Sequence, residues 1–96
     1  MRVRWTAPAA QDLYRITRYI SRDNPAAARD VAKILYDGCE ALVNSPLRGR
    51  KGRLKNTREI VFPGLPYIAV YRVVGDEDAV EMLHFYHGAH NWPLSE

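Results

Sequence analysis

Hydrophobic positions in the first half of the chain recur every three or four residues. This spacing places apolar side chains on one face of a helix. It predicts one helix over residues 8–22 and a second over residues 25–44, joined by a tight turn. The predicted buried faces consist of Leu13, Ile16 and Ile20 on the first helix, and of Ala28, Val31, Ala32, Leu35, Cys39 and Leu42 on the second.

Capping residues mark where each predicted helix begins. Thr6 can accept a hydrogen bond from a backbone N–H of the first turn, and Pro8 suits that turn because no N–H donor is needed there. Asn24 and Pro25 repeat the arrangement before the second helix. The two helices are therefore expected to form a hairpin with defined ends.

Beyond residue 56 the hydrophobic period becomes two, as expected for strands. The segments TREIVF, YIAVYRVV and AVEMLHFYH are rich in β-branched and aromatic residues, and the turn sequences PGLP and GDED separate them. A further short strand, MRVRW, opens the chain and points Val3 inward. We expect the three consecutive strands to form an antiparallel meander, and the opening strand to pair beside the last one.

These elements predict an α+β fold in a single small domain over residues 1–96, with the element order β-α-α-β-β-β. The antiparallel sheet is expected to carry the two-helix hairpin on one face only. Its opposite face is then either solvated or used for binding.

Composition narrows the class of protein. An apolar fraction of 47% is enough for one core, and the lone Cys39 excludes an internal disulfide and favours a reducing compartment. The sequence contains no apolar run that could span a bilayer and no signal-peptide pattern. We therefore expect a cytoplasmic protein with no membrane partner.

Positive charge is concentrated in one segment of a chain whose net charge is +3. Residues 48–58, RGRKGRLKNTR, hold six cations and no carboxylate. Such a block is typical of a surface that binds phosphates, with an affinity that falls as salt rises; the alternative is a solvated loop kept positive for solubility. The residues predicted to contact a nucleic-acid backbone are Arg48, Arg50, Lys51, Arg53 and Lys55.

Two aromatic residues extend this predicted nucleic-acid-binding surface. Tyr67 and Tyr71 share one face of the predicted central strand, where a base could stack on them. Equally, they are ordinary strand residues. Arg15, Arg18 and Arg22 form a stripe on the first helix, either as its solvated face or as a further nucleic-acid contact.

Several motifs occur here in an order that resembles one family. They are WTAPAAQDLYRITRYISRDNPAAA, GRKGRLKNTREIVFPGLPYIAVYRVV and MLHFYHGAHNWP. Together, over roughly residues 3–93, they resemble the RelE/ParE superfamily of bacterial toxins, of the RelE/StbE-like plasmid-stabilisation type. The resemblance implies a compact type II toxin, neutralised by a cognate antitoxin in a hetero-oligomeric complex.

The resemblance implies one of two targets. RelE-like members enter the ribosome and cut mRNA, whereas ParE-like members inhibit DNA gyrase and have no nuclease activity. We expect a metal-independent endoribonuclease without a cofactor, acting on mRNA at the ribosome. The ParE-type gyrase inhibitor is the alternative, and a degenerate member that only binds its antitoxin is a third.

RNA cleavage requires a cationic clamp on the phosphate and a group that carries a proton. Arg58 and Arg72 are the predicted clamp, and His87, at the end of the last strand, is the predicted proton carrier. The resemblance implies a catalytic role for the position of His87. Where RelE-like nucleases place an arginine and a tyrosine, this chain has Ile68 and Gly88, which keeps the gyrase alternative open.

Strand parity separates the histidines of the last strand. His84 is expected to share a face with Val80, Met82 and Tyr86 as a structural residue, whereas His87 should share the other face with Leu83 and Phe85. We expect no metal site among His84, His87 and His90, because no cysteine and few carboxylates would complete a ligand set.

Overall fold

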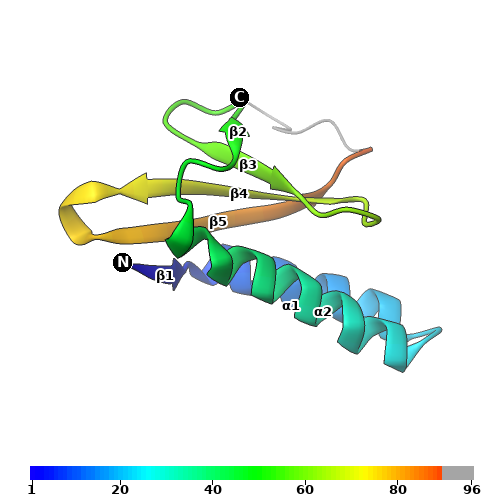
Figure 1. Ribbon diagram of the computed structural model, residues 1–96. Coiled ribbons are helices and arrows are strands. Elements are labelled where there is room, and N and C mark those ends of the chain that lie inside the picture. The colour runs from blue at the N-terminus through cyan, green and yellow to red at the C-terminus, as the bar shows by residue number, and fades with distance from the viewer. Residues whose placement is uncertain (90–96) are drawn as a thin grey trace.

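The computed structural model describes residues 1–89, in which two helices lie side by side across one face of a five-stranded sheet (Figure 1). His90, included in the metal-site expectation, lies outside this range. The helices are α1 (Ala7–Ser21) and α2 (Pro25–Glu40), and α2 continues as a 3-10 turn, Ala41–Asn44. The strands are β1 (Arg2–Trp5), β2 (Arg50–Lys51), β3 (Arg58–Val61), β4 (Tyr67–Val74) and β5 (Ala79–His87).

Both predicted helix caps are confirmed. The side chain of Thr6 accepts a hydrogen bond from the backbone N–H of Ala9, and its hydroxyl donates to the carbonyl of Met82 at 2.8 Å. The side chain of Asn24 accepts from the N–H of Ala27 at 3.0 Å. Thr6 therefore begins α1 and also ties it to β5.

The strand order is β1-β5-β4-β3-β2. The predicted pairing of the opening strand with the last one is confirmed, and so is the meander of β3, β4 and β5. Two details correct the expectation. β1 runs parallel to β5, so the sheet is not wholly antiparallel, and the basic segment contributes the additional short strand β2.

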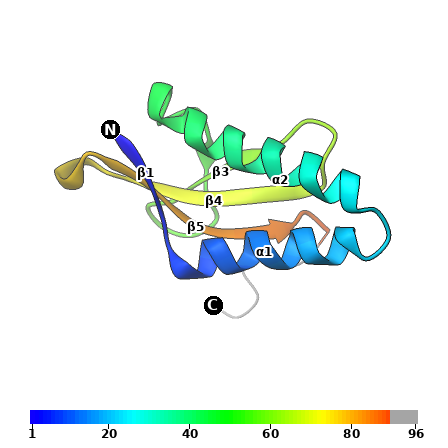
Figure 2. The same ribbon diagram turned by 90° about the horizontal axis from the view of Figure 1, so that it is seen from below.

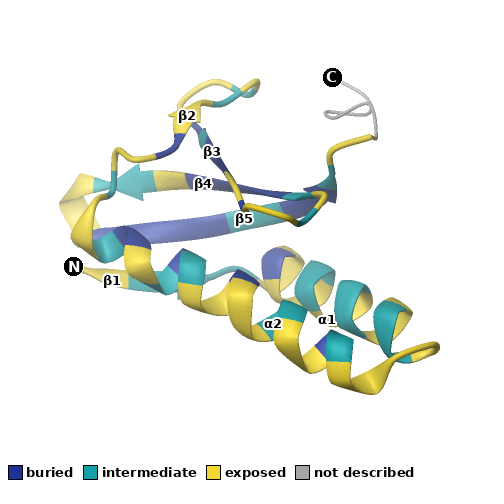
Figure 3. Ribbon diagram, turned by 45° about the vertical axis from the view of Figure 1, so that its right-hand side comes forward, coloured by how far each residue is buried: buried dark blue, intermediate teal, exposed yellow. Residues whose placement is uncertain are grey.

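The main core lies between the helices and the sheet (Figure 3). Leu35, Cys39 and Leu42 from the α2 region meet Tyr71 and Met82 from the sheet, and all five are fully buried. A smaller apolar cluster of Ile68, Val70 and Tyr86 occupies the opposite face of the sheet. Both helices lie below the sheet in Figure 1 and face the viewer in Figure 2, so no helix covers that opposite face. The expectation that helices cover one face only is confirmed.

A β-bulge in β5 changes which side chains share a face. Val70 pairs with His84, but the next residue, Tyr71, pairs with Met82, so Leu83 has no partner in the β4–β5 register. Because one extra residue reverses the alternation, the parity expectation was wrong across this point. Leu83 packs against the smaller cluster, away from the helices, so His87 does not share its face. His84 likewise pairs with Val70, on the face opposite Met82.

Tyr71 is a structural residue. Its ring is fully buried in the main core, its hydroxyl donates to the carbonyl of Pro46 at 2.7 Å, and the same oxygen accepts from the N–H of Gly49 at 2.9 Å. Burial raises the pKa of this phenol. The proposed stacking of an RNA base on Tyr71 is therefore wrong, because its ring is not accessible.

We predict that Tyr71→Phe lowers the free energy of unfolding by about 1–3 kcal/mol, because the N–H of Gly49 and the carbonyl of Pro46 lose a buried partner. Urea denaturation followed by circular dichroism measures the change. The control is Tyr14→Phe, which removes a hydroxyl from an exposed ring on α1. Equal losses in both variants would contradict the structural role assigned to the Tyr71 hydroxyl.

Candidate functional site

The basic segment forms a hairpin that is fastened to the sheet face opposite the helices (Figure 1). We call residues 48–59 the basic hairpin. Its β2 and β3 arms pair Arg50 with Glu59 and Lys51 with Arg58, and the N–H of Gly52 donates to the carbonyl of Thr57 at 2.8 Å. The cations thus project from an ordered ribbon.

Glu59 is the anchor of the basic hairpin. Only 2% of this residue is exposed, and its carboxylate accepts three hydrogen bonds at 3.1 Å. The donors are the Arg50 guanidinium, the backbone N–H of Arg53 and the Tyr86 hydroxyl. Burial alone would raise the pKa of Glu59, but these three donors lower it below its usual value, so the carboxylate is ionised at neutral pH.

Two glycines permit the close approach of the basic hairpin to the protein. A Cβ at Gly49 would lie 2.7 Å from the Tyr71 hydroxyl, and a Cβ at Gly52 would lie 2.1 Å from the Thr57 hydroxyl. Arg58 reinforces the same junction, since its Nη1 donates to the carbonyls of Leu47 at 3.1 Å and Gly49 at 2.7 Å. Arg58 is therefore occupied in holding the base of the hairpin.

The remaining cations of the basic hairpin divide into two groups. Arg50 pairs with Glu59, and the Arg53 guanidinium lies 5.5 Å from the centre of the Tyr86 ring. The other three are exposed at the hairpin surface, and within residues 1–89 no hydrogen bond or ion pair from their side chains is found. These three are Arg48, Lys51 and Lys55.

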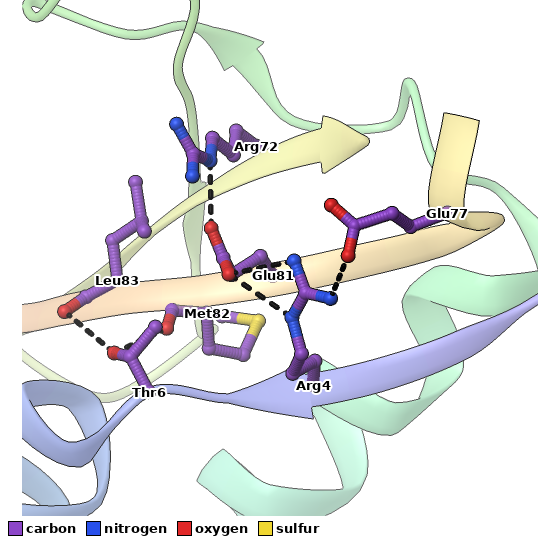
Figure 4. A network of polar contacts seen from close by, with 7 residues as sticks. All are labelled: Arg4, Thr6, Arg72, Glu77, Glu81, Met82 and Leu83. Carbon is purple, nitrogen blue, oxygen red and sulfur yellow. Dashed lines mark hydrogen bonds and ion pairs between the residues drawn. The ribbon is translucent and has the colours of Figure 1, made fainter. Parts of the chain in front are cut away.

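Arg72 belongs to a separate ion-pair network (Figure 4). The Nε of Arg72 donates to Glu81 at 2.7 Å, and Glu81 also forms an ion pair with Arg4. Arg4 forms a second ion pair with Glu77. Burial would raise the pKa of Glu81, but the hydrogen bonds from Arg72 and Arg4 lower it. The network joins β1, β5 and β4, so Arg72 has a structural partner.

His87 lies at the opposite end of β5 from this network. Its ring is half-buried, meets the Tyr67 ring edge-on with centroids 5.7 Å apart, and accepts the N–H of Ala89 at Nδ1. Tyr67 and His87 are cross-strand partners on the helix side of the sheet. The structure thus brings the predicted residues Tyr67 and His87 together, but it does not bring Arg58 or Arg72 to them.

A groove of about 1100 Å³ runs between α1 and the second half of β5. β1 pairs only with Ala79–Met82, so α1 side chains border the rest of β5. Asp12 accepts hydrogen bonds from the N–H of Phe85 at 3.0 Å and lies 3.2 Å from Nδ1 of His84. Arg15, Arg18 and Arg22 give the α1 side of the groove a positive charge.

Sequence reasoning missed the carboxylates that organise these sites, Asp12, Glu59 and Glu81. The signal for Glu59 was present, because it alternates with the apolar residues of the strand and so faces the hairpin side. What could not be read from the sequence is the register that sets Arg50 opposite Glu59.

Three further features bear on function in residues 1–89: the Cys39 thiol, the grouping of metal-ligating side chains and the length of the helices. Burial raises the pKa of the Cys39 thiol to about 12, which makes it a poor nucleophile. Within residues 1–89, no three side chains of His, Cys, Asp or Glu are grouped so that they could hold a metal ion. None of the helices described there is long and apolar enough to cross a membrane.

Comparison with solved structures places the fold in the RelE/ParE class. "Chromosomal ParDE TA system from P. aeruginosa" matches with a TM-score of 0.78 and 24% identity, covering 91% of this chain and 95% of that chain. The RelBE2 toxin–antitoxin complex of Mycobacterium tuberculosis matches with a TM-score of 0.58 and 24% identity, covering 93% and 92%. The intact E. coli RelBE complex matches with a TM-score of 0.59 and 12% identity, covering 93% and 98%.

Sequence comparison gives the family. Residues 3–92 match the family described as "ParE toxin of type II toxin-antitoxin system, parDE". The protein "Putative toxin Y4kP" of Sinorhizobium fredii is 41% identical over 92 residues, which covers 96% of this chain and 93% of that protein. The chain therefore belongs to the ParE toxin family of type II toxin–antitoxin systems, within the RelE/ParE superfamily.

We predict that Glu59→Gln destabilises the protein by about 2 kcal/mol at pH 7, because hydrogen bonds to a charged acceptor are lost or weakened. Because the pKa of Glu59 is lower in the folded protein than its usual value of 4.5, the ionised carboxylate contributes its full stabilisation well above pH 4.5. This contribution is lost as the pH falls through the folded-state pKa. The difference between wild type and variant should therefore shrink below about pH 4.5. Urea denaturation between pH 3 and pH 7 measures it.

The matched control for Glu59→Gln is Asp30→Asn, which neutralises an exposed carboxylate on α2. We expect this control to change the free energy of unfolding by less than about 0.5 kcal/mol at pH 7. A Glu59→Gln variant as stable as the control at pH 7 would show that Glu59 does not anchor the basic hairpin.

Proposed function

We propose that this ParE-family toxin inhibits DNA gyrase by binding and does not cut RNA. The dispersal of Arg58, Arg72 and His87 supports this proposal most directly. A general acid or base must lie within about 3 Å of the proton that it transfers, and a phosphate clamp must hold the same substrate. Residues that serve one reaction therefore have to converge.

The strand register gives the separation of these residues. His87 pairs with Tyr67 of β4, and Arg72 lies five positions from Tyr67 along β4, which corresponds to about 17 Å at the usual rise of a strand. Arg58 pairs with Tyr71, which lies four positions or about 13 Å from Tyr67 along β4, and Arg58 is one strand further from His87. Arg58 and Arg72 also have structural partners, so neither supplies a phosphate clamp beside His87.

Membership of the ParE family also supports a gyrase target, because ParE-like toxins lack nuclease activity. Two positions that differ from the RelE-like nucleases also favour a gyrase target. Ile68 is packed in the small apolar cluster, where nucleases of the superfamily place an arginine, and Gly88 stands where they place a tyrosine. The ribosome-dependent endoribonuclease is the competing hypothesis that an experiment has to exclude.

We predict that the purified protein blocks DNA supercoiling by gyrase and leaves mRNA intact in a translating extract. An agarose gel of relaxed plasmid with gyrase and ATP measures the first activity. Primer extension on a reporter message measures the second. The contrary result would be message cleavage that falls by about 10²-fold in His87→Ala, the usual contribution of a general acid or base, with supercoiling unaffected.

We further propose that a cognate antitoxin neutralises the toxin by placing an acidic segment in the groove between α1 and β5. The structural neighbours from P. aeruginosa, M. tuberculosis and E. coli are described as toxin–antitoxin systems or complexes. The groove combines apolar Ile16 and Phe85 with the cations Arg15, Arg18 and Arg22, which suits an amphipathic acidic segment.

We predict that Arg15→Glu with Arg22→Glu weakens antitoxin binding by at least about tenfold, because like charges would then meet in the groove. Isothermal titration calorimetry with the product of the adjacent gene measures the affinity. The matched control, Lys51→Glu with Lys55→Glu, makes the same charge change on the basic hairpin and should bind normally. If the control loses binding and the groove variant does not, the antitoxin covers the basic hairpin instead.

A further inference from the structure

We propose that the basic hairpin binds the sugar–phosphate backbone of duplex DNA. This inference rests on the proposed function in one respect: the duplex that the toxin meets would be the DNA that gyrase holds. The binding surface itself follows from the charge, anchoring and surroundings of the hairpin. It requires no catalytic group.

The charge of the hairpin is local. Residues 48–59 contain six cations and one carboxylate, while the whole chain carries a net charge of only +3, so the rest of the chain is net negative. The single carboxylate, Glu59, is buried and already accepts the Arg50 guanidinium. Arg48, Lys51 and Lys55 project from this ribbon as exposed cations. The basic hairpin is therefore the densest concentration of cations along the chain, and it attracts a polyanion.

The ribbon that carries these cations is held in place before any partner arrives. Glu59 binds the backbone N–H of Arg53, Arg58 binds two carbonyls, and the Tyr71 hydroxyl links Pro46 to Gly49. A surface ordered in advance loses less conformational entropy on binding. This favours a contact function over that of a loop kept positive for solubility.

The surroundings favour a duplex over a single strand. Proteins that bind single strands pair a cationic groove with aromatic side chains on which bases stack. Beside the basic hairpin, Tyr86 is only 7% exposed and its ring faces the Arg53 guanidinium, while Tyr71 is fully buried. Tyr67 lies on the helix side of the sheet. Among residues 1–89, the basic hairpin therefore has no accessible ring beside it for base stacking, and such an arrangement of cations suits contact with a stacked duplex through its phosphates.

The composition of the hairpin also distinguishes DNA from an acidic protein surface. The centres of protein–protein interfaces are enriched in aromatic and other apolar anchors and depleted in lysine. Within residues 48–59 the one large apolar side chain is Leu54, and it is half-buried. Lys51 and Lys55 are exposed, and a lysine ammonium group acts on a phosphate as a point charge.

The expected strength follows from counterion release. If Arg48, Lys51 and Lys55 each neutralise one phosphate, the slope of log K against log salt should be about −2.7. Affinity should then fall by about 40-fold between 50 and 200 mM salt. Because backbone contacts do not read bases, unrelated duplexes should bind equally.

Fluorescence anisotropy of the full chain with labelled 30-base-pair duplexes of two unrelated sequences tests the proposal. We expect the slope given above for wild type. The triple variant Arg48→Gln, Lys51→Gln, Lys55→Gln should lose at least about tenfold in affinity at 0.1 M salt, with a slope near zero. The charge-retaining variant Arg48→Lys, Lys51→Arg, Lys55→Arg should bind like wild type.

The matched control is Arg2→Gln, Arg29→Gln, Lys33→Gln, which removes the same charge from exposed positions on other surfaces. It should keep most of the affinity and the slope. Equal losses in the control and hairpin variants would overturn the proposal, because net charge alone would then explain binding. Thermal melts of all variants establish that they are folded.

Three further outcomes would overturn the assignment to duplex DNA. They are a wild-type slope near zero, tighter binding to a single-stranded oligonucleotide or RNA hairpin than to duplex DNA, and hairpin-dependent binding to DNA-free gyrase without DNA binding. The anisotropy experiment contains no gyrase, so failure of the gyrase proposal would leave its result unchanged. The two proposals can therefore fail separately.

Discussion

The buried carboxylate of Glu59 is the interaction on which the functional side of this molecule depends. It satisfies one guanidinium, one backbone N–H and one phenol, and these donors come from the basic hairpin and from β5. Without an acceptor at this point, the Arg50 guanidinium, the Arg53 N–H and the Tyr86 hydroxyl would each lose a partner. With it, the hairpin is fixed and Arg48, Lys51 and Lys55 remain exposed.

The two charged surfaces occupy different parts of the fold. The groove lies beside α1, on the helix side of the sheet, and the basic hairpin lies on the side away from the helices (Figure 1). A toxin with this arrangement can present one surface to its antitoxin and another to its target. Neutralisation would then require that the antitoxin alter or block access to the target without covering every cation.

Several sequence-based expectations were confirmed because local interactions decide them. The caps at Thr6 and Asn24 and the buried stripe through Leu35 and Cys39 follow from residue type and helical spacing. The assignments that were wrong, for the faces of Leu83 and His84 and for Tyr71 as a stacking ring, depend on one unpaired residue in β5 and on packing from distant segments.

The sequence by itself determined both helices, four of the five strands described in residues 1–89, the α+β class and the concentration of positive charge, because these depend on residue type and short-range spacing. Only the tertiary structure decided which cations have partners and which residues converge. Arg58, Arg72 and His87 are separated by strand register, and Arg50 meets Glu59 through the same kind of register. Register is set by packing over the whole sheet, so no local pattern could reveal it.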